Sequence, residues 1–339
     1  MLRWSKKWQT SALLQAWATW QWSNFLVQQN TEGKPVLRIN LDESSLKLHI
    51  PSGTGFVVEP CPKRRRVLLQ VGNGPDLKTK RAAVTLIAFA CDDDAVQRIL
   101  PQVFVANEHV VTKGDIDTML GRCKDNVVVL RRKSSWVNAE FMVELIQMLA
   151  KCLGEYLQSH HVVFHMDAFR AHLHLSVLDA CSDAGMHLLV IPASATAWLQ
   201  PLDVYVFCKF KDWVTREVER QRLCSASGQL SRPQVLEVYR RAVDKVIRAR
   251  SWARAFDLCG LRGQGNVSGR LMGRLGLTAS PAIGCDLPSL MDLQAVFPSG
   301  TDIPIEAIFR KVLAKTVAKL GPVLRLPSSA RLPRAPALA

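Results

Sequence analysis

Three aspartates are the residues of this sequence best suited to chemistry: Asp42, Asp167 and Asp203. We expect Asp42 at the end of a first strand, Asp167 at the end of a central strand and Asp203 at the start of a helix. Strands paired side by side in one sheet can bring their ends together however far apart they lie in the chain. Three carboxylates at one sheet edge would repel one another and raise each other's pKa unless cations neutralise them.

The ligand chemistry of three such aspartates suits hard divalent cations. Carboxylate oxygens bind Mg²⁺ or Mn²⁺ well, and two ions about 3.5 to 4 Å apart can stabilise both the attacking and the leaving oxygen of a phosphodiester. The set therefore predicts two-metal chemistry on phosphate esters. Each aspartate taken alone has a simpler explanation, because Asp is common at strand ends and helix N-caps for turn and capping reasons.

Histidine and glutamate side chains lie near these aspartates in the sequence. Glu43 follows Asp42 in a strand and should point to the opposite face, which favours a supporting or structural role over metal ligation. Six of the eight histidines fall between residues 160 and 187, but no Cys pairs accompany them, so polar core or surface histidines are a better explanation than zinc. They are His160, His161, His165, His172, His174 and His187.

Basic side chains supply candidate contacts to a polyanion. The run Lys63, Arg64, Arg65 and Arg66 has three interpretations: a nuclear localisation signal, a contact to the DNA backbone, or a solvated strand edge. Lys209 and Lys211, just beyond Asp203, are further candidate DNA contacts. The loop residue Trp198 could stack on a base or pack.

Composition limits the class of protein. The chain has 339 residues, a hydrophobic content of 48% and a net charge of +15, which exclude wholesale disorder and favour a polyanionic partner. The nine cysteines include no Cys-x-x-Cys pair, so we expect a reducing compartment without a disulfide framework. No apolar run reaches the roughly 18 to 20 residues that cross a bilayer.

Hydrophobic periodicity divides the chain into four predicted parts. Residues 1–30 should hold an amphipathic helix, at 3–27, with a Trp-rich face. Residues 31–222 should form the core domain, residues 223–320 a helical region, and residues 321–339 a disordered basic, Pro-rich tail.

Within the predicted core domain, strands and helices alternate. Strands are expected at 36–42, 67–71, 82–90, 161–167 and 188–192. Helices are expected at 136–158, at 171–184 and from Asp203 onward, followed by helices at 235–249, 252–258 and 305–320 in the C-terminal region.

The residues around the three aspartates resemble a known family. The stretch 191–204, with Leu199-Gln200-Pro201-Leu202-Asp203 at its centre and Phe210-Lys211 beyond it, is similar to the third-carboxylate motif of DDE superfamily endonucleases. More narrowly, it resembles the pogo and jerky branch of the Tc1/mariner-like transposases. Asn40-Leu41-Asp42-Glu43 resembles the first acidic motif, and Met166-Asp167 with His172 resembles the second.

Further landmarks follow in the order that this family has. They place the resemblance over roughly residues 35 to 265, and 35 residues separate Asp167 from Asp203, close to the family's spacing. The landmarks are 81–85, 100–104, 135–138 and 251–256 with Gly260.

The resemblance implies an α/β, RNase H-like fold, expected as a mixed five-stranded sheet flanked by helices, with an additional helical C-terminal region. Asp42, Asp167 and Asp203 would bind two Mg²⁺ or Mn²⁺ ions, so that water or a DNA 3′-hydroxyl attacks a DNA phosphodiester in line. Glu43, His172 and Gln200 would support the ligands. The expected partner is DNA rather than a membrane, a homodimer is compatible with the resemblance, and the expected location is the nucleus.

Two departures from the family keep a second hypothesis open. Ala168 follows Asp167 where the family has Asn, which removes a polar group that would orient the site. About 35 residues precede the first motif, too few for the helix-turn-helix reader of transposon ends. The alternative is a DNA- or protein-binding module that descends from a transposase and no longer cuts.

Overall fold

The computed structural model describes most of the chain between residues 31 and 262. The described residues are 31, 33–48, 84–120, 126–169, 171–191, 196–225 and 228–262. The predicted helix at 3–27, the strand at 67–71, the basic run Lys63 to Arg66, the helix at 305–320 and the tail lie outside them.

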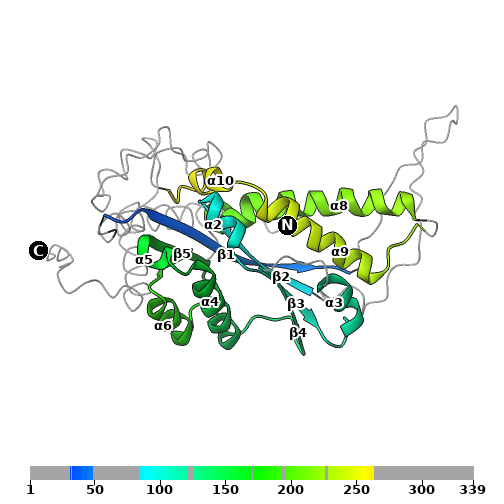
Figure 1. Cartoon of the computed structure of the whole chain (residues 1–339), viewed down its shortest axis with the longest axis horizontal. Coiled ribbons are helices and arrows are strands. Elements are labelled where there is room, and N and C mark those ends of the chain that lie inside the picture. The colour runs from blue at the N-terminus through cyan, green and yellow to red at the C-terminus, as the bar shows by residue number, and fades with distance from the viewer. Residues whose placement is uncertain are drawn as a thin grey trace, which may run out of the picture.

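A six-stranded mixed sheet forms the centre of the described region, in the order β4-β3-β2-β1-β5-β6 (Figure 1). Strands β1, β2 and β3 are antiparallel, whereas β5 and β6 continue parallel to β1 and β4 pairs parallel to β3. The strands are β1 Val36–Leu46, β2 Val84–Cys91, β3 Gln102–Asn107, β4 Val127–Arg132, β5 His161–Asp167 and β6 His187–Ile191.

This arrangement confirms the predicted RNase H-like mixed sheet, with six strands where five were expected. Strands β3 and β4 were not predicted as strands. Strand β1 also differs from prediction, because it continues to Leu46. Asp42 therefore lies inside a strand and not at its end.

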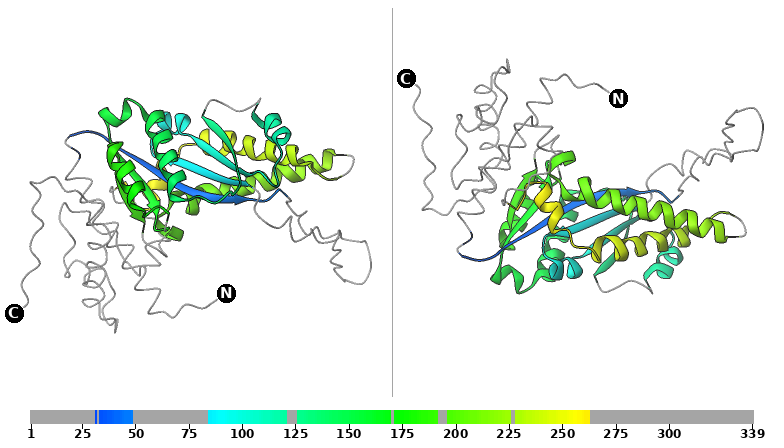
Figure 2. Two further views of the ribbon diagram at one scale, coloured as in Figure 1. Left: turned by 90° about the horizontal axis from the view of Figure 1, so that it is seen from below. Right: turned by 90° about the horizontal axis from the view of Figure 1, so that it is seen from above.

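Helices cover both faces of the sheet, with α8 and α9 on one side and α4 and α6 on the other (Figures 1 and 2). The helices are α2 Asp94–Ile99, α3 Lys113–Leu120, α4 Ala139–Leu153, α5 Tyr156–Ser159, α6 Leu175–Asp183, α7 Thr196–Leu199, η2 Leu202–Val206, α8 Phe207–Cys224, α9 Arg232–Ala242, η3 Val243–Arg248 and α10 Ala253–Leu258. No helix among these described residues is long and apolar enough to cross a membrane.

Two hydrophobic cores, one on each face, hold these layers together. The first core joins the sheet to α8, α9, η3 and α10, and it includes Phe210, Tyr239 and Trp252. The second joins the sheet to α4 and α6 through residues such as Phe141 and Leu145. The helices at 232–258 therefore share a core with the sheet.

Helix α4 shows how local sequence sets the element boundaries. The Asn138 side chain caps the helix by accepting a hydrogen bond from the Phe141 N–H at 3.0 Å. At the other end Gly154 has a φ of 50°, a left-handed conformation that favours glycine and stops the helix. The predicted helix at 136–158 is therefore two helices, α4 and α5, and Trp136 lies before both.

The strand register places the acidic residues. Leu37, Ile39 and Leu41 alternate toward the core with α4 and α6, so Asn40 and Asp42 face the α8 side. Strands β1 and β5 are parallel, with Asn40 opposite His165. Two residues further along each strand, Asp42 and Asp167 are neighbours.

Candidate active site

Asp42 and Asp203 form the acidic half of the site. Asp42 is buried, with 8% of its surface exposed, whereas Asp203 lies at the surface on η2. The Asp42 side chain interacts with the Asp203 carboxyl group and lowers the pKa of Asp203 against the effect of burial. Burial, the charge of Asp203 and the charge of Glu43 raise the pKa of Asp42 well above its usual range. The neutral form of Asp42 is therefore favoured over its carboxylate more strongly than for an exposed aspartate.

Asp203 lies on an unusual piece of helix. It is the second residue of the π-helical turn η2, which continues directly into α8, whereas the sequence predicts an ordinary helix start. Single π-helical turns are rare and often occur at functional sites. Burial raises the pKa of Asp203, and the positive charge of Lys211 on α8 opposes that rise.

The Asn40 side chain connects the three elements that carry the aspartates, which are β1, β5 and η2. It is fully buried on β1, and its Nδ2 donates to the carbonyl of His165 on β5 at 3.1 Å. Its Oδ1 accepts a hydrogen bond from the backbone N–H of Leu202 on η2 at 3.0 Å. Each bonded backbone group lies one or two residues before an aspartate, so one amide fixes their relative positions.

Asp167 belongs to a second group, in which charges are already paired. The buried imidazole of His172 donates from Nδ1 to Asp167 Oδ1 at 2.7 Å, and from Nε2 to Glu43 Oε1 at 3.1 Å. The backbone N–H of Phe169 donates to the same Asp167 oxygen at 3.0 Å. We call the three side chains Asp167, His172 and Glu43 the histidine clamp.

The charge state of the histidine clamp follows from these contacts. Burial alone would lower the pKa of His172, but the hydrogen bonds to Asp167 and Glu43 outweigh it and raise that pKa to about 10. Burial opposes ionisation of Asp167, yet the hydrogen bond and charge of His172 bring its pKa below the usual value. The clamp is thus an imidazolium between two carboxylates. Among the described residues nothing bonds Asp167 Oδ2.

Glu43 and Gln200 lie near the site in different ways. Glu43 faces away from Asp42, as strand alternation requires, and it joins the histidine clamp. The Gln200 side chain is completely buried, and in the described part of the structure neither of its polar atoms has a hydrogen-bond partner. Its position just before η2 places it next to Asp203 in the chain, but no contact to the aspartates supports a positioning role.

The candidate DNA contacts on α8 are both exposed. Lys211 interacts electrostatically with Asp203, and its ammonium lies 5.7 Å from the centre of the Phe207 ring. The Lys209 ammonium lies 5.4 Å from the centre of the Trp252 ring. Lys211 is therefore the lysine nearer to the acidic half of the site. Trp198 is half-buried and packs against the core.

The donor chemistry suits a divalent cation, but the carboxylates do not form a closed ligand set. Within the described ranges, no group of three His, Cys, Asp or Glu side chains is close enough to hold a metal ion. Asp42 and Asp203 are in contact, while Asp167 interacts with both only through its charge. All donors are oxygens, as Mg²⁺ and Mn²⁺ prefer, and a cation would relieve the repulsion that protonates Asp42.

The remaining histidines do not gather around a metal. His165 is buried and bonds the carbonyl of Ile39 through Nδ1, and burial lowers its pKa to about 3, so it is neutral. The rings of His161 and His187 are 5.7 Å apart. Among the described residues these side chains belong to no group of three that could hold a metal ion.

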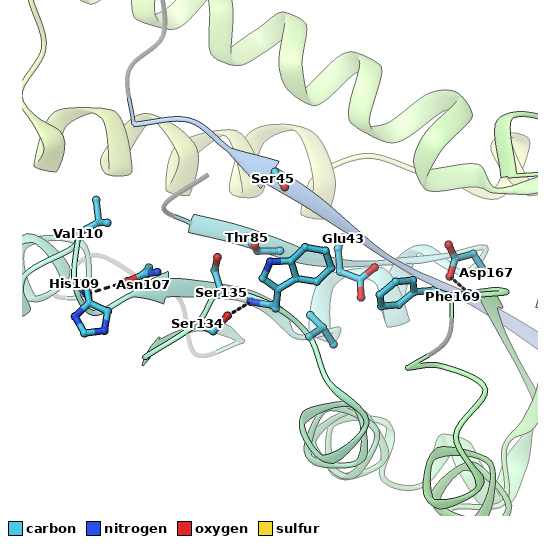
Figure 3. Close-up of a pocket in the computed structure, with 12 residues that line it drawn as sticks. Glu43, Ser45, Thr85, Asn107, His109, Val110, Ser134, Ser135, Asp167 and Phe169 are labelled. Carbon is cyan, nitrogen blue, oxygen red and sulfur yellow. Dashed lines mark hydrogen bonds between the residues drawn. The ribbon is translucent and has the colours of Figure 1, made fainter. Parts of the chain in front are cut away.

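A cleft of about 810 Å³ lies next to the histidine clamp. Figure 3 shows Asp167 and Glu43 toward one end of it and Asn107 and His109 toward the other. Its lining also includes Trp136, which is 75% exposed. The sequence analysis assigned Trp136 to the predicted helix at 136–158. It therefore did not identify this exposed aromatic residue as part of the cleft.

The family comparison agrees with this geometry. The strand order defines an RNase H-like core, and β1, β5 and η2 each carry one of the three aspartates. Residues 126–256 match the model of a family described as DDE superfamily endonuclease, and this segment contains both Asp167 and Asp203. This segment is therefore similar to DDE superfamily endonucleases. Asp42 lies upstream of the matched segment, and the pogo and jerky branch remains a prediction.

Solved structures also resemble the chain at low identity. The Mos1 transposase in a paired-end complex with the left transposon end is 14% identical, with a TM-score of 0.40 over 77% of this chain and 66% of that one. The Mos1 mariner transposase catalytic domain is 13% identical, with a TM-score of 0.35 over 77% of this chain and 98% of that one. No protein of curated function matches the sequence.

Proposed function

We propose that this chain is a transposase-derived, divalent-metal-dependent DNA endonuclease that cleaves a phosphodiester or transfers a DNA strand end. The observation that carries the proposal is the pair Asp42 and Asp203, two interacting carboxyl groups in a partly buried site, with the pKa of each raised by burial. Such a pair is destabilised by its own charge, and a cation is the natural way to neutralise it.

The residues of the site would divide the work as follows. Asp42, Asp203 and the unbonded Oδ2 of Asp167 would hold one or two Mg²⁺ or Mn²⁺ ions. When bound, such ions neutralise charge at the phosphate and activate a water or a 3′-hydroxyl. His172 and Glu43 keep Asp167 ionised and oriented, and Asn40 fixes the distance between its strand and η2.

DNA is the proposed substrate because the net charge of +15 attracts polyanions and because the matched family acts as endonucleases. Lys211 and Lys209 on α8 are proposed contacts to the DNA backbone. A nuclear location is proposed from the run Lys63, Arg64, Arg65 and Arg66 alone. A homodimer is compatible with the proposal.

Metal-dependent nicking of a supercoiled plasmid tests the function. The full chain with Mn²⁺ or Mg²⁺ should convert supercoiled DNA to open circles, and EDTA should abolish the conversion. Asp203→Asn should remove nicking, whereas Asp212→Asn should not, because Asp212 is an exposed aspartate elsewhere on α8. Equal nicking by wild type and Asp203→Asn would show a contaminating nuclease and refute the proposal.

A binding module without catalysis is the second candidate. Two observations favour it: no three ligands converge in the described structure, and Ala168 stands where the family has a polar residue. The two functions differ in their response to metal. If Mn²⁺ leaves the melting temperature unchanged while the protein still binds DNA in a salt-sensitive way, the binding module is the better description.

A further inference from the structure

The cleft beside the histidine clamp opens onto Asp167, one of the three proposed metal ligands. Asp167 and Glu43 belong both to its wall and to the clamp. Its volume of about 810 Å³ falls within the range of pockets that bind small organic groups. Anything that fills the cleft is therefore adjacent to a phosphodiester that the aspartates would hold.

Two exposed aromatic rings line this cleft. Trp136 is 75% exposed and Phe169 is 40% exposed, and their ring centres are 6.5 Å apart. Phe169 in turn contacts the His172 ring edge-on at 5.5 Å. A continuous row of rings thus runs from Trp136 to the histidine clamp.

The backbone around Trp136 is fixed although its side chain is in solvent. The Trp136 N–H donates to Ser134 Oγ at 3.1 Å, and the next residue, Val137, is buried. Asn138 then caps α4. The indole is therefore held in place with a free face, which is the arrangement expected of a platform for a flat ligand.

Polar side chains complete the wall. Ser134 and Ser135 lie along the cleft, and Asn107 and His109 lie at the end away from the carboxylates (Figure 3). These hydroxyl, amide and imidazole groups can donate or accept hydrogen bonds at the edge of a heteroaromatic ring. The cleft thus offers stacking faces together with polar groups at its rim.

We propose that this cleft binds the base of an unpaired nucleotide adjacent to the scissile phosphodiester, stacked on Trp136 with Phe169 beside it. The inference deepens the proposed function and rests on it, since it names the part of the DNA that enters the site. Aromatic side chains stack on any base, so the subsite tolerates different sequences. The base must be unpaired, because pairing and stacking in a duplex cover its faces.

The test separates base recognition from backbone recognition. Binding of the full chain is measured by fluorescence anisotropy with two end-labelled 12-mers of equal charge: oligothymidylate, and the same sugar-phosphate backbone without bases. Wild type should bind the strand with bases more tightly, and Trp136→Ala should weaken that binding roughly 5- to 150-fold, the range measured when a stacking residue is removed. Binding to the abasic strand should not change.

Two further variants guard against indirect effects. Trp136→Phe keeps a ring and should retain part of the preference for bases. Leu223→Ala removes another exposed apolar side chain, which is 89% exposed at the end of α8, and should bind both strands like wild type. Because Trp136 is largely solvated, its variants should melt within a few degrees of wild type.

The outcomes distinguish this inference from the proposed function. If Trp136→Ala weakens both strands equally or neither strand, no base stacks there and this inference is wrong, while DNA cleavage at the aspartates stands. If wild type binds neither strand, both the inference and the proposed DNA substrate are wrong.

Discussion

The two halves of the acidic site differ in how their charge is balanced. In the histidine clamp, one buried imidazolium neutralises Asp167 and Glu43 within the protein. In the other half, Asp42 accepts a hydrogen bond from the backbone N–H of Glu43 at 2.8 Å, the positive charge nearest Asp203 in the described structure is that of Lys211, and burial still raises the pKa of Asp42. The first half has its counter-ion within the protein, whereas we propose that the second half takes a cation from outside.

This difference shows which carboxylates respond to metal and which hold the framework. The protein provides an internal counter-ion for Asp167, which keeps that side chain charged and oriented on β5. It provides none of comparable strength for Asp42. We therefore expect substitutions in the two halves to have effects of different size and kind.

The largest expected effect comes from substituting, one at a time, the two adjacent acidic residues that lie on opposite faces of β1. Asp42→Asn should lower metal-dependent nicking at least about a thousandfold, or about 4 kcal/mol in the activation barrier, because a proposed ligand is lost. Glu43→Gln should lower it less than about tenfold, since an amide oxygen still accepts from His172. Nicking rates of the two variants measure the contrast, and equal losses would show that the two halves do not differ.

A smaller effect is expected inside the histidine clamp. His172→Ala should lower nicking or apparent Mn²⁺ affinity about 10- to 100-fold, the usual cost of removing a group that orients a metal ligand. Titration with Mn²⁺ at constant DNA gives the affinity. His174→Ala is the control, because His174 is exposed and bonds only Ser176 locally. A His172→Ala variant with wild-type kinetics would contradict the clamp's role.

Asn40 connects the two halves, so its loss should affect both. Asn40→Ala leaves the N–H of Leu202 and the carbonyl of His165 buried without this partner, which costs about 1 to 3 kcal/mol of stability. Urea unfolding measures that cost. Asn126→Ala removes a comparable bridging amide between α2 and β4, away from the aspartates, and should lower stability without reducing nicking by folded protein.

The pH dependence of stability offers the smallest but most selective test. Asp42 has a raised pKa when folded, so without metal its contribution is present below pH 4 and is lost as the pH rises toward that pKa. The stabilising contribution of His172, whose folded pKa is about 10, is likewise lost as the pH rises above 6.5. The melting temperature should fall by a few degrees between pH 5 and 9, since about 1 kcal/mol corresponds to roughly 2–4 °C for a domain of this size.

Asp42→Asn removes one of these two titrating groups and should therefore flatten the fall in melting temperature. Saturating Mn²⁺ should do the same by displacing the proton. A wild-type profile that stays flat without metal would argue against the raised pKa of Asp42.

The sequence predicted some of these features and could not predict others. The apolar residues of β1 and β5 were enough to predict these two strands of the sheet, whereas the predicted site residues stay a prediction. Strands β3 and β4 were missed because periodicity alone does not distinguish a short apolar run in a strand from one in a buried helix segment. The histidine clamp was not predictable in detail, because Glu43 meets His172 only through the folding of residues 129 positions apart.

Trp136 was misassigned for a related reason. It was predicted to be the first residue of the helix at 136–158, but the cap at Asn138 begins the helix after it. Hydrophobic periodicity alone does not show where the N-cap lies, so the first apolar residue of a pattern can lie outside the helix. The exposed indole became evident only from its solvent exposure and its place in the cleft.

The π-helical turn before α8 has a consequence for the direction of Asp203. A regular α-helix advances about 100° for each residue, and the wide turn at 202–206 contains more residues per turn than that. Deleting one residue there, such as Val204, would restore an uninterrupted α-helix and rotate everything before it by about 100° relative to α8. The buried face of α8 would then stay on the sheet while Asp203 turned away from Asp42. The rotation of residues 202–206 about the helix axis, and not the packing of α8, therefore decides where the third carboxylate points.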